Sequence, residues 1–322
     1  MRTSIALSFL ASALTVFAKA ISKPDPNFHV YLAFGQSNME GAGPVEVQDR
    51  IADKRYKLLS TADNCMGREL GEWYYALPPI VSCFGNLSPL DWFGRTLTKN
   101  LPEEVTVGIV PVAVAGADIQ LFEEENYATY EQPDWMQERS DSYGGNPYRR
   151  LIDMAKKAQE DGVIKGILLH QGETNNGQAN WPDRVKVIYE RILKELDLKA
   201  EDVPLLVGEV VSLEKDGLCG LHNEVINNVP KVIPTAHVIH ASDLDHQGDG
   251  LHFTSASYRI FGERYAEKML ELLCMEGDAA AAEETETVVV EETCDEESDQ
   301  DQDVDAGDVN GVEEEDSADD EE

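Results

Sequence analysis

The sequence predicts an α/β fold in which helices cover both faces of a largely parallel sheet of five strands. Two observations lead to this class. Short apolar runs rich in β-branched and aromatic residues recur along the chain, and segments with helical spacing of apolar residues separate them. Strands that alternate with helices are typical of parallel sheets buried on both faces. A third observation, the uneven charge of the chain, confines this single domain to residues 21–275.

The predicted strands are apolar runs that end at turn residues or polar segments. The first ends at Gly35, and the second contains Pro111, which cannot donate to a strand ladder and which we expect to bend it. Residues 50–91 are rich in Gly, Pro and aromatic side chains, and we expect loops there. The five predicted strands are residues 28–34, 105–114, 163–169, 203–211 and 236–241.

Three helices are predicted between and after these strands. Pro147 suits the first position of a helix over residues 147–159, which the following Asp-Gly pair would end. A second helix is expected over residues 182–198. The last begins near Thr254 and carries one apolar stripe, formed by Tyr258, Phe261, Tyr265, Met269 and Leu272.

The charge of the chain is concentrated at its C-terminal end. The 322 residues carry a formal net charge of −36, but 23 of the 62 acidic residues and none of the 26 Lys and Arg residues lie in 276–322. We therefore expect residues 276–322 to form a solvated, disordered acidic tail that could bind cations weakly. A calcium loop is not expected there, because Ala306 stands where the loop needs glycine and Val312 where it needs glutamate. Nucleic acid is excluded as a partner, since phosphate binding needs clustered Lys and Arg.

The first twenty residues have the pattern of a secretory signal peptide. Arg2 precedes an apolar run over residues 5–17, and Ala18-Lys19-Ala20 supplies small residues before a cleavage point. The run is shorter than the ~20 residues that span a bilayer. We therefore expect residues 1–20 to be removed and the mature protein to be secreted, without a membrane partner after cleavage.

Export permits disulfides, and five cysteines are present. Cys65 and Cys83 flank one loop-rich stretch and are the first expected pair. Cys219 with Cys274 is the second choice, which leaves Cys294 in the tail unpaired. The absence of C-x-x-C pairs disfavours a structural zinc site.

Polar residues gather where the predicted strands end, which is where ligands bind in parallel sheets. Residues 35–41 (GQSNMEG) suit a tight turn that would expose the hydroxyl of Ser37, although a serine after a strand is also a common helix cap. After the second strand, Gly116 would let a backbone N–H approach a ligand, unless it is an ordinary turn glycine.

Residues 170–175 (HQGETN) follow the third strand and are too densely polar to serve packing alone. The side-chain amide of Gln171 could donate to a developing oxyanion. Glu173 could orient a base or hold the loop.

Two D-x-x-H patterns precede the last helix: Asp243 with His246, and Asp249 with His252. A carboxylate three residues from a histidine can fix its tautomer and leave Nε2 to accept a serine proton. A metal site is the rival interpretation, but no other cluster supplies a third ligand.

The blocks GQSNMEG, HQGETN and DGLHFT, in this order, resemble those of the SGNH hydrolases. More narrowly, they resemble the family-six carbohydrate esterases and the sialate O-acetylesterase-type domains, over roughly residues 30–273. Residues 89–97 also resemble the helix that these proteins carry before a further block, which in this chain is the Val-Ala-Gly turn at residues 114–116. The resemblance implies a three-layer, flavodoxin-like α/β/α fold and removal of acetyl groups from carbohydrates, with no metal or organic cofactor.

The resemblance also implies a role for each matching residue. Ser37 matches the nucleophile, His252 the general base and Asp249 the acid that orients it, with Glu173 as the alternative third member of the triad. The oxyanion hole would consist of the Ser37 and Gly116 N–H groups and the Gln171 amide. This chain departs from the family in the alanines on both sides of Gly116 and in Glu209, where relatives often carry glutamine.

The implied substrate is an acetylated carbohydrate, with acetylated xylan or a related plant polysaccharide first. A sialate O-acetylesterase and a small-oligosaccharide acetylesterase are alternatives on the same chemistry. From another class, a carbohydrate-binding protein on this fold would lack turnover altogether.

Overall fold

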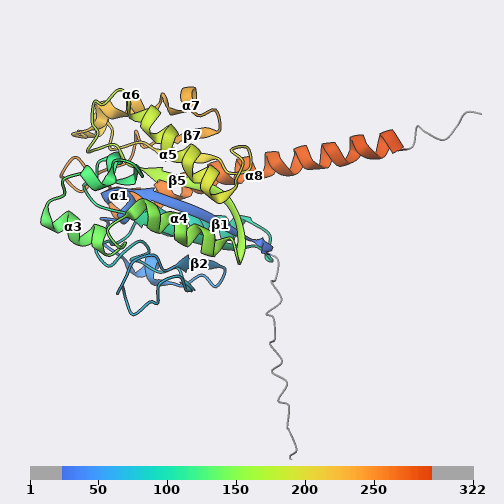
Figure 1. The fold of residues 1–322 in the computed structure, drawn as a ribbon, viewed down its shortest axis with the longest axis horizontal. Helices are drawn as coiled ribbons and strands as arrows, with labels where there is room; N and C mark the ends of the chain where they lie inside the picture. Colours follow the sequence, from blue (N-terminus) through green and yellow to red (C-terminus); the bar gives the residue numbers. More distant parts are fainter. Residues whose placement is uncertain (1–23, 292–322) are drawn as a thin grey trace, which may run out of the picture. The chain divides into compact units, whose positions relative to one another are not determined.

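A largely parallel sheet with helices on both faces forms the centre of the protein (Figure 1). The structure is a computed structural model and describes residues 24–291. Contacts divide the chain into two compact units, Met1–Cys274 and Met275–Glu322. The predicted signal peptide over residues 1–20 and the chain from residue 292 on, with Cys294, lie outside the described residues.

The sheet has seven strands in the order β3-β2-β4-β1-β5-β6-β7, and only the β2–β3 pair is antiparallel. The fold class predicted from the sequence is confirmed, but the count of five strands is wrong. The strands are β1 (Asp25–Gly35), β2 (Tyr56–Leu59), β3 (Trp73–Tyr75), β4 (Thr106–Ala113), β5 (Gly162–His170), β6 (Leu205–Gly208) and β7 (Ala236–Ile239).

The two additional strands, β2 and β3, come from residues 50–91, where loops were predicted. They have four and three residues, too few to show a period, and their pairing with β4 and with each other supplies their hydrogen bonds. Strand β6 is shorter than its apolar run because the chain leaves the sheet after Gly208.

Alternate residues of β1 separate the core into two halves. Val30, Leu32 and Phe34 pack in one apolar cluster with α4 (Pro147–Ala158) and α5 (Trp181–Leu196). Tyr31 and Ala33 pack in the other cluster with α2 (Pro89–Asn100) and the start of α8 (Ser255–Glu291). The period of two in a buried strand therefore produces the three layers seen in Figure 1.

The predicted helices are confirmed to within a few residues, and α4 and α2 begin at residues whose side chains cap them. The side chain of Asn146 accepts the N–H of Arg149 at the start of α4, and Pro147 follows at the first position. Ser88 caps α2 in the same way. The remaining helices are short: α1 (Ser37–Glu40), α3 (Asp134–Asp141), α6 (Asn223–Ile226) and α7 (Val229–Val232). Single 3₁₀ turns lie at Val47–Arg50, Ile119–Phe122, Tyr127–Thr129, Leu213–Lys215 and Gly220–His222.

Helix α8 continues to Glu291, whereas the sequence predicts a disordered tail from residue 276. The structure thus assigns residues 276–291 to this helix. The four alanines at 279–282 favour a helix, and their effect outweighs the acidic composition on which the prediction depends.

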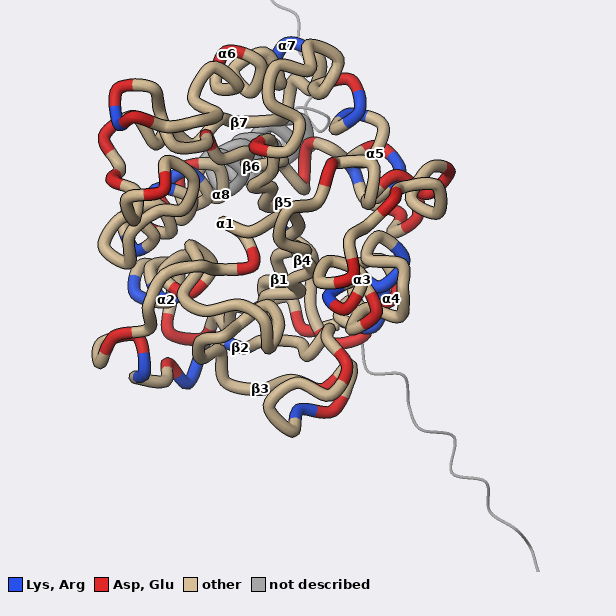
Figure 2. Tube along the Cα trace, turned by 90° about the vertical axis from the view of Figure 1, so that its left-hand side faces the viewer, with Lys and Arg blue, Asp and Glu red and all other residues tan. Residues whose placement is uncertain are grey.

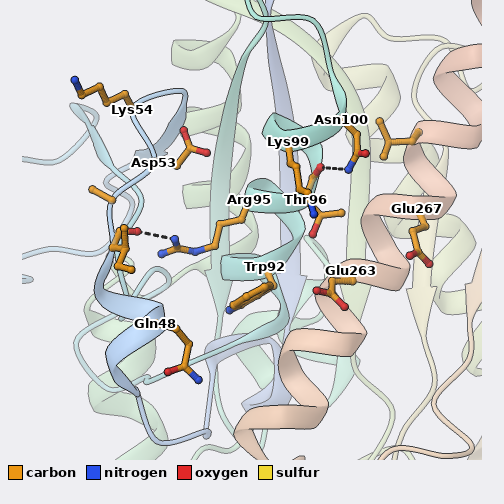
Figure 3. Close-up of a pocket in the computed structure, with 13 residues that line it drawn as sticks. Gln48, Asp53, Lys54, Trp92, Arg95, Thr96, Lys99, Asn100, Glu263 and Glu267 are labelled. Carbon is orange, nitrogen blue, oxygen red and sulfur yellow. Dashed lines mark hydrogen bonds between the residues drawn. The ribbon is translucent and has the colours of Figure 1, made fainter.

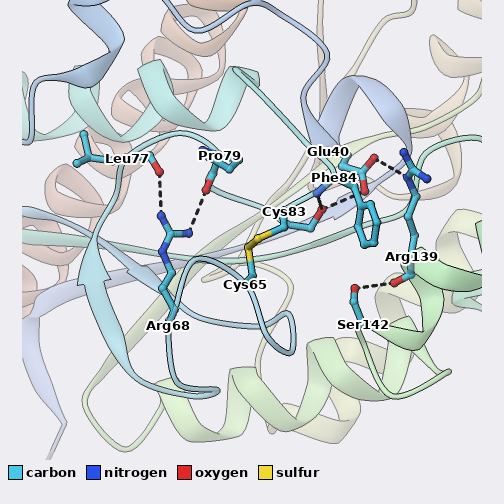
Figure 4. The surroundings of a disulfide bond; sticks show 10 residues. Glu40, Cys65, Arg68, Leu77, Pro79, Cys83, Phe84, Arg139 and Ser142 are labelled. Carbon is cyan, nitrogen blue, oxygen red and sulfur yellow. Dashed lines mark hydrogen bonds and ion pairs between the residues drawn. A yellow bond between two sulfur atoms is a disulfide. The ribbon is translucent and has the colours of Figure 1, made fainter.

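Cys65 and Cys83 form the predicted disulfide, with their Cα atoms 5.3 Å apart (Figure 4). The second-choice pair is wrong, because Cys219 and Cys274 are both free thiols. Cys219 lies in a loop with its Sγ 3.4 Å from the carbonyl oxygen of Glu173, while Cys274 is exposed on α8. Over residues 24–291, no helix is long and apolar enough to cross a membrane.

Candidate active site

Ser37 stands at the carboxyl end of β1, a central strand of the sheet, and is the first residue of α1. The turn between strand and helix is tight, since a Cβ at Gly35 would lie 2.0 Å from the carbonyl oxygen of His170. The N–H of Gln36 donates to that same oxygen, at 3.0 Å. As the first helical residue, Ser37 keeps a backbone N–H with no acceptor among the described residues.

The structure brings Ser37, His252 and Asp249 into one chain of contacts. The Nε2 atom of His252 lies 3.0 Å from the Oγ of Ser37, and its Nδ1 lies 2.7 Å from Oδ2 of Asp249. The other carboxylate oxygen of Asp249 accepts the N–H groups of Leu251 and His252, each at 2.9 Å. Partial burial opposes ionisation, but these two N–H groups and the imidazole together lower the pKa of Asp249 to about 2.

Gly116 lies beside Ser37 and has a φ of 73°, a conformation that favours glycine. A Cβ at this position would meet Cη2 of Trp135 at 2.6 Å. Within the described part of the chain, its N–H donates to no hydrogen bond, while its carbonyl accepts the hydroxyl of Thr174 at 2.9 Å. Of the two flanking alanines, Ala115 lines the pocket and Ala117 is fully buried.

Gln171, which the resemblance places in the oxyanion hole, does not line the pocket in the structure. The side chain is fully buried, and its Oε1 accepts the indole N–H of Trp181 at 2.5 Å. Its Nε2 faces three acceptors: Oδ1 of Asn175 at 2.6 Å, and Oε1 of Gln36 and the carbonyl of Ala117, both at 3.1 Å. Two N–H bonds are thus already shared among three oxygens, which leaves none for a substrate.

The glutamine that lines the pocket is Gln36. Its Oε1 accepts from Gln171 Nε2 and, at 3.4 Å each, from the backbone N–H groups of Gly172 and Thr174. These donors fix the orientation of the amide. Its Nε2 has no partner among the described residues and is not closed off from solvent, and Gln36 lines the same pocket as Ser37.

Glu173, the alternative acid, contacts Asn38 rather than His252. Its Oε1 accepts from Nδ2 of Asn38 at 2.6 Å and lies 3.8 Å from Nδ1 of His170. Asn38 Nδ2 also donates to the carbonyl of Leu251, at 2.9 Å. Glu173 therefore supports the loop that carries His252, and of the two acids Asp249 is the one that contacts the imidazole ring.

The other D-x-x-H pattern, Asp243 with His246, makes contacts that hold the structure together. Asp243 makes two 2.7 Å contacts with the guanidinium of Arg264. The Nδ1 of His246 accepts the N–H groups of Gly248 and Gly250, so this ring shapes the loop before Asp249. In residues 24–291, no group of three or more His, Cys, Asp or Glu could hold a metal ion.

Glu209, the other departure, also supports structure. Its two oxygens accept the side-chain amide of Asn227 and the backbone N–H of Ala241.

A pocket of about 520 Å³ opens above Ser37 and His252. Three of its side chains, Trp135, Leu218 and Cys219, were not predicted from the sequence, because Trp135 lies on a helix of eight residues and the other two lie in a loop region without a period. The lining comprises Gln36, Ser37, Ala115, Gly116, Trp135, Glu173, Thr174, Leu218, Cys219, Leu251 and His252.

A larger hollow of about 880 Å³ lies elsewhere, between α2, the start of α8 and the segment around Asp53 (Figure 3). Arg95 on α2 is tied to the carbonyls of Asp49 and Ile51, and Trp92 donates its indole N–H to Asp49. None of the residues that line this hollow belongs to the predicted catalytic set.

A serine, a histidine and an aspartate in contact at the carboxyl edge of a parallel sheet form the arrangement that a serine hydrolase requires. The family assignment is narrower. A family model described as carbohydrate esterase, sialic acid-specific acetylesterase, matches residues 27–271. The chain therefore belongs to this family of carbohydrate acetylesterases.

Solved structures are similar in fold. A protein of Arabidopsis thaliana is 18% identical with a TM-score of 0.59, over 77% of this chain and 99% of that one. The crystal structure of NanS is 16% identical with a TM-score of 0.57, over 78% and 99% of the two chains. A carbohydrate acetylesterase from Xanthomonas citri is 17% identical with a TM-score of 0.53, over 74% and 55%.

Proposed function

We propose that this protein is a secreted serine esterase that removes O-acetyl groups from carbohydrates, with acetylated xylan or a related plant polysaccharide as substrate. The observation that carries the proposal is the relay from Ser37 Oγ through His252 to Asp249, with contacts of 3.0 and 2.7 Å, at the base of an open pocket. Secretion follows from the signal-peptide pattern of residues 1–20.

In the proposed first step, Ser37 Oγ attacks the acetyl carbonyl carbon while His252 Nε2 accepts the hydroxyl proton. The carbonyl oxygen becomes an oxyanion that the free N–H groups of Ser37 and Gly116 stabilise, with Gln36 Nε2 as a third donor. Gln171 does not contact the substrate in this mechanism; it orients the side-chain amide of Gln36 by donating to its Oε1. His252 then gives its proton to the sugar oxygen, and the C–O bond breaks.

In the second step, water attacks the acetyl-enzyme. His252 accepts a proton from the water and returns one to Ser37 Oγ as acetate leaves. Asp249 stays ionised throughout, since its pKa lies near 2, and stabilises the imidazolium formed in each step.

The test is acetate release from acetylated xylan and from an aryl acetate by the full chain and by its Ser37→Ala variant. We expect release by the parent and loss in the variant. Release that persists in the variant would remove Ser37 as nucleophile. Binding of acetylated xylan without any release by the folded parent would favour the carbohydrate-binding alternative.

A sialate O-acetylesterase is the second candidate, and the description of the matching family favours it. Acetate release from an O-acetylated sialic acid at a higher kcat/KM than from acetylated xylan would select this candidate.

A further inference from the structure

The wall of the candidate active site next to Gly116 is an exposed indole. Trp135, near the start of α3, keeps 49% of its surface exposed, and its Cη2 stands within contact distance of Gly116. Leu218 and Leu251 also line the pocket, and Leu218 is 68% exposed. Large apolar side chains held open to solvent around a serine and a histidine indicate a surface that a ligand covers.

The indole is held in place by contacts that do not depend on a ligand. Arg139, one turn further along α3, donates to the carbonyl of Trp135 at 2.9 Å, and its guanidinium carbon lies 5.4 Å from the Trp135 ring centroid. The same guanidinium lies 4.8 Å from the ring of Phe84 and contacts Oε2 of Glu40 at 3.3 Å. Figure 4 shows Phe84 and Arg139 beside the Cys65–Cys83 disulfide.

Glu40 links this support to the nucleophile helix. It is the last residue of α1, is buried, and also accepts the hydroxyl of Ser82. The indole is therefore positioned relative to Ser37 through a short network of contacts, and a ligand can cover its exposed face with little reorganisation of the side chain.

The lining of the pocket has no cation to receive an anionic sugar. Among its described residues there is no Lys or Arg, and Glu173 contributes a carboxylate. Nearby cations on the flanking segments are already paired: Arg139 with Glu40, Arg184 with Asp118 and Glu123, and Lys215 with Asp245. Figure 2 shows how Lys and Arg, in blue, and Asp and Glu, in red, are distributed along the backbone trace.

We infer that the indole of Trp135 is the wall of a leaving-group subsite. The apolar face of a neutral pyranoside stacks on this wall, and the subsite rejects anionic sugars. This inference rests on the proposed function and narrows its substrate. The CH-rich face of a neutral pyranoside packs on the indole without leaving an unpaired charge. A sialate or uronate would bring a carboxylate next to Glu173 with no counter-ion.

The charge part is tested with two substrates that differ in one group: acetylated methyl glucuronoside and the corresponding glucuronamide. Acetate release is measured for both with the full chain. We expect kcat/KM for the neutral amide to be higher by at least about tenfold. Equal values, or a preference for the carboxylate, would overturn the inference.

The stacking part is tested with the Trp135→Ala and Trp135→Phe variants on acetylated methyl xyloside and on ethyl acetate, which has no ring. The ratio of the two kcat/KM values should fall about tenfold in Trp135→Ala, mainly through KM, and recover largely in Trp135→Phe. Trp92→Ala, which removes an indole from the hollow in Figure 3, is the matched control and should leave the ratio unchanged. An unchanged ratio in Trp135→Ala would exclude the subsite.

The proposed carbohydrate function and the Trp135 subsite can be disproved separately. If the parent chain cleaves ethyl acetate but no acetylated sugar, the proposed carbohydrate function is wrong, and the subsite with it. If the parent cleaves acetylated sugars but neither charge nor Trp135 changes kcat/KM, the function stands and the subsite alone is wrong.

Discussion

The Nε2 atom of His252 lies 3.0 Å from the Oγ of Ser37, although 215 residues separate the two along the chain. The contact forms because Ser37 follows the central strand β1, while His252 comes directly before α8, which packs against the same sheet. Asn38 fixes the distance further. Its Oδ1 accepts the N–H of Phe253 and the hydroxyl of Tyr258. The residue that follows Ser37 is therefore hydrogen-bonded to the residue that follows His252.

The third member of the relay can be identified with two isosteric variants. Asp249→Asn should lower kcat by on the order of 10³–10⁴, because the imidazolium loses its counter-ion and its tautomer is no longer fixed. Glu173→Gln keeps an oxygen for Asn38 and should cost about fivefold, the value of one altered hydrogen bond. Steady-state acetate release measures both.

The matched control for these variants is Asp243→Asn, the aspartate of the other D-x-x-H pattern, which pairs with Arg264 at the surface. It should stay close to the parent. A larger loss in Glu173→Gln than in Asp249→Asn would assign the acid to Glu173.

The contributions of Gln36 and Gln171 to oxyanion stabilisation can be distinguished by replacing each of them with methionine. Gln36→Met removes the Nε2 group that faces the pocket, and kcat should fall by about 10²–10³ with little change in KM. Gln171→Met removes a buried amide and leaves the Trp181 N–H unpaired, so its main effect should be a loss of stability of about 1–3 kcal/mol. Near-normal kcat in Gln36→Met would leave the two backbone N–H groups as the only donors.

The disulfide should stabilise the loop that supports Trp135. It closes a segment with a sequence separation of 18 residues, and loop-closure entropy for that length corresponds to about 3 kcal/mol, or roughly 6–12 °C in melting temperature. We expect this loss in the Cys65→Ser/Cys83→Ser double variant and in the reduced parent. Cys274→Ser, which removes an exposed free thiol, is the control. Identical melting curves with and without reductant would contradict the prediction.

The predicted residues that the structure brings into contact, Ser37, Asp249 and His252, depend mainly on their local sequence. Ser37 is in a short turn after a buried strand, and Asp249 and His252 are three residues apart, so both positions depend on neighbours in the chain. Strand β1 could be recognised because eleven residues are long enough to show an apolar run. Strands β2 and β3 could not, since their stability comes from pairing with β4.

The burial of Gln171 could not be predicted from the sequence, for a related reason. Two glutamines follow strand ends, and the sequence does not reveal which amide points to the pocket. Trp181, from α5, decides this by donating to Gln171 and holding it in the core, which leaves Gln36 at the surface of the pocket. Trp135 was missed because its helix has eight residues and only two buried positions.

Stability should decrease in mild acid because of His222. This ring is fully buried against Gly172 and Trp181, and burial lowers its pKa to about 4. A histidine with a lowered pKa binds its proton more tightly in the unfolded chain, so its contribution is complete above pH 6.5 and is lost as the pH falls toward 4, at up to about 1.4 kcal/mol per pH unit. Melting temperatures from pH 7 to 4 should therefore fall more steeply for the parent than for His222→Phe. Parallel curves for the parent and His222→Phe would show that another group causes the loss.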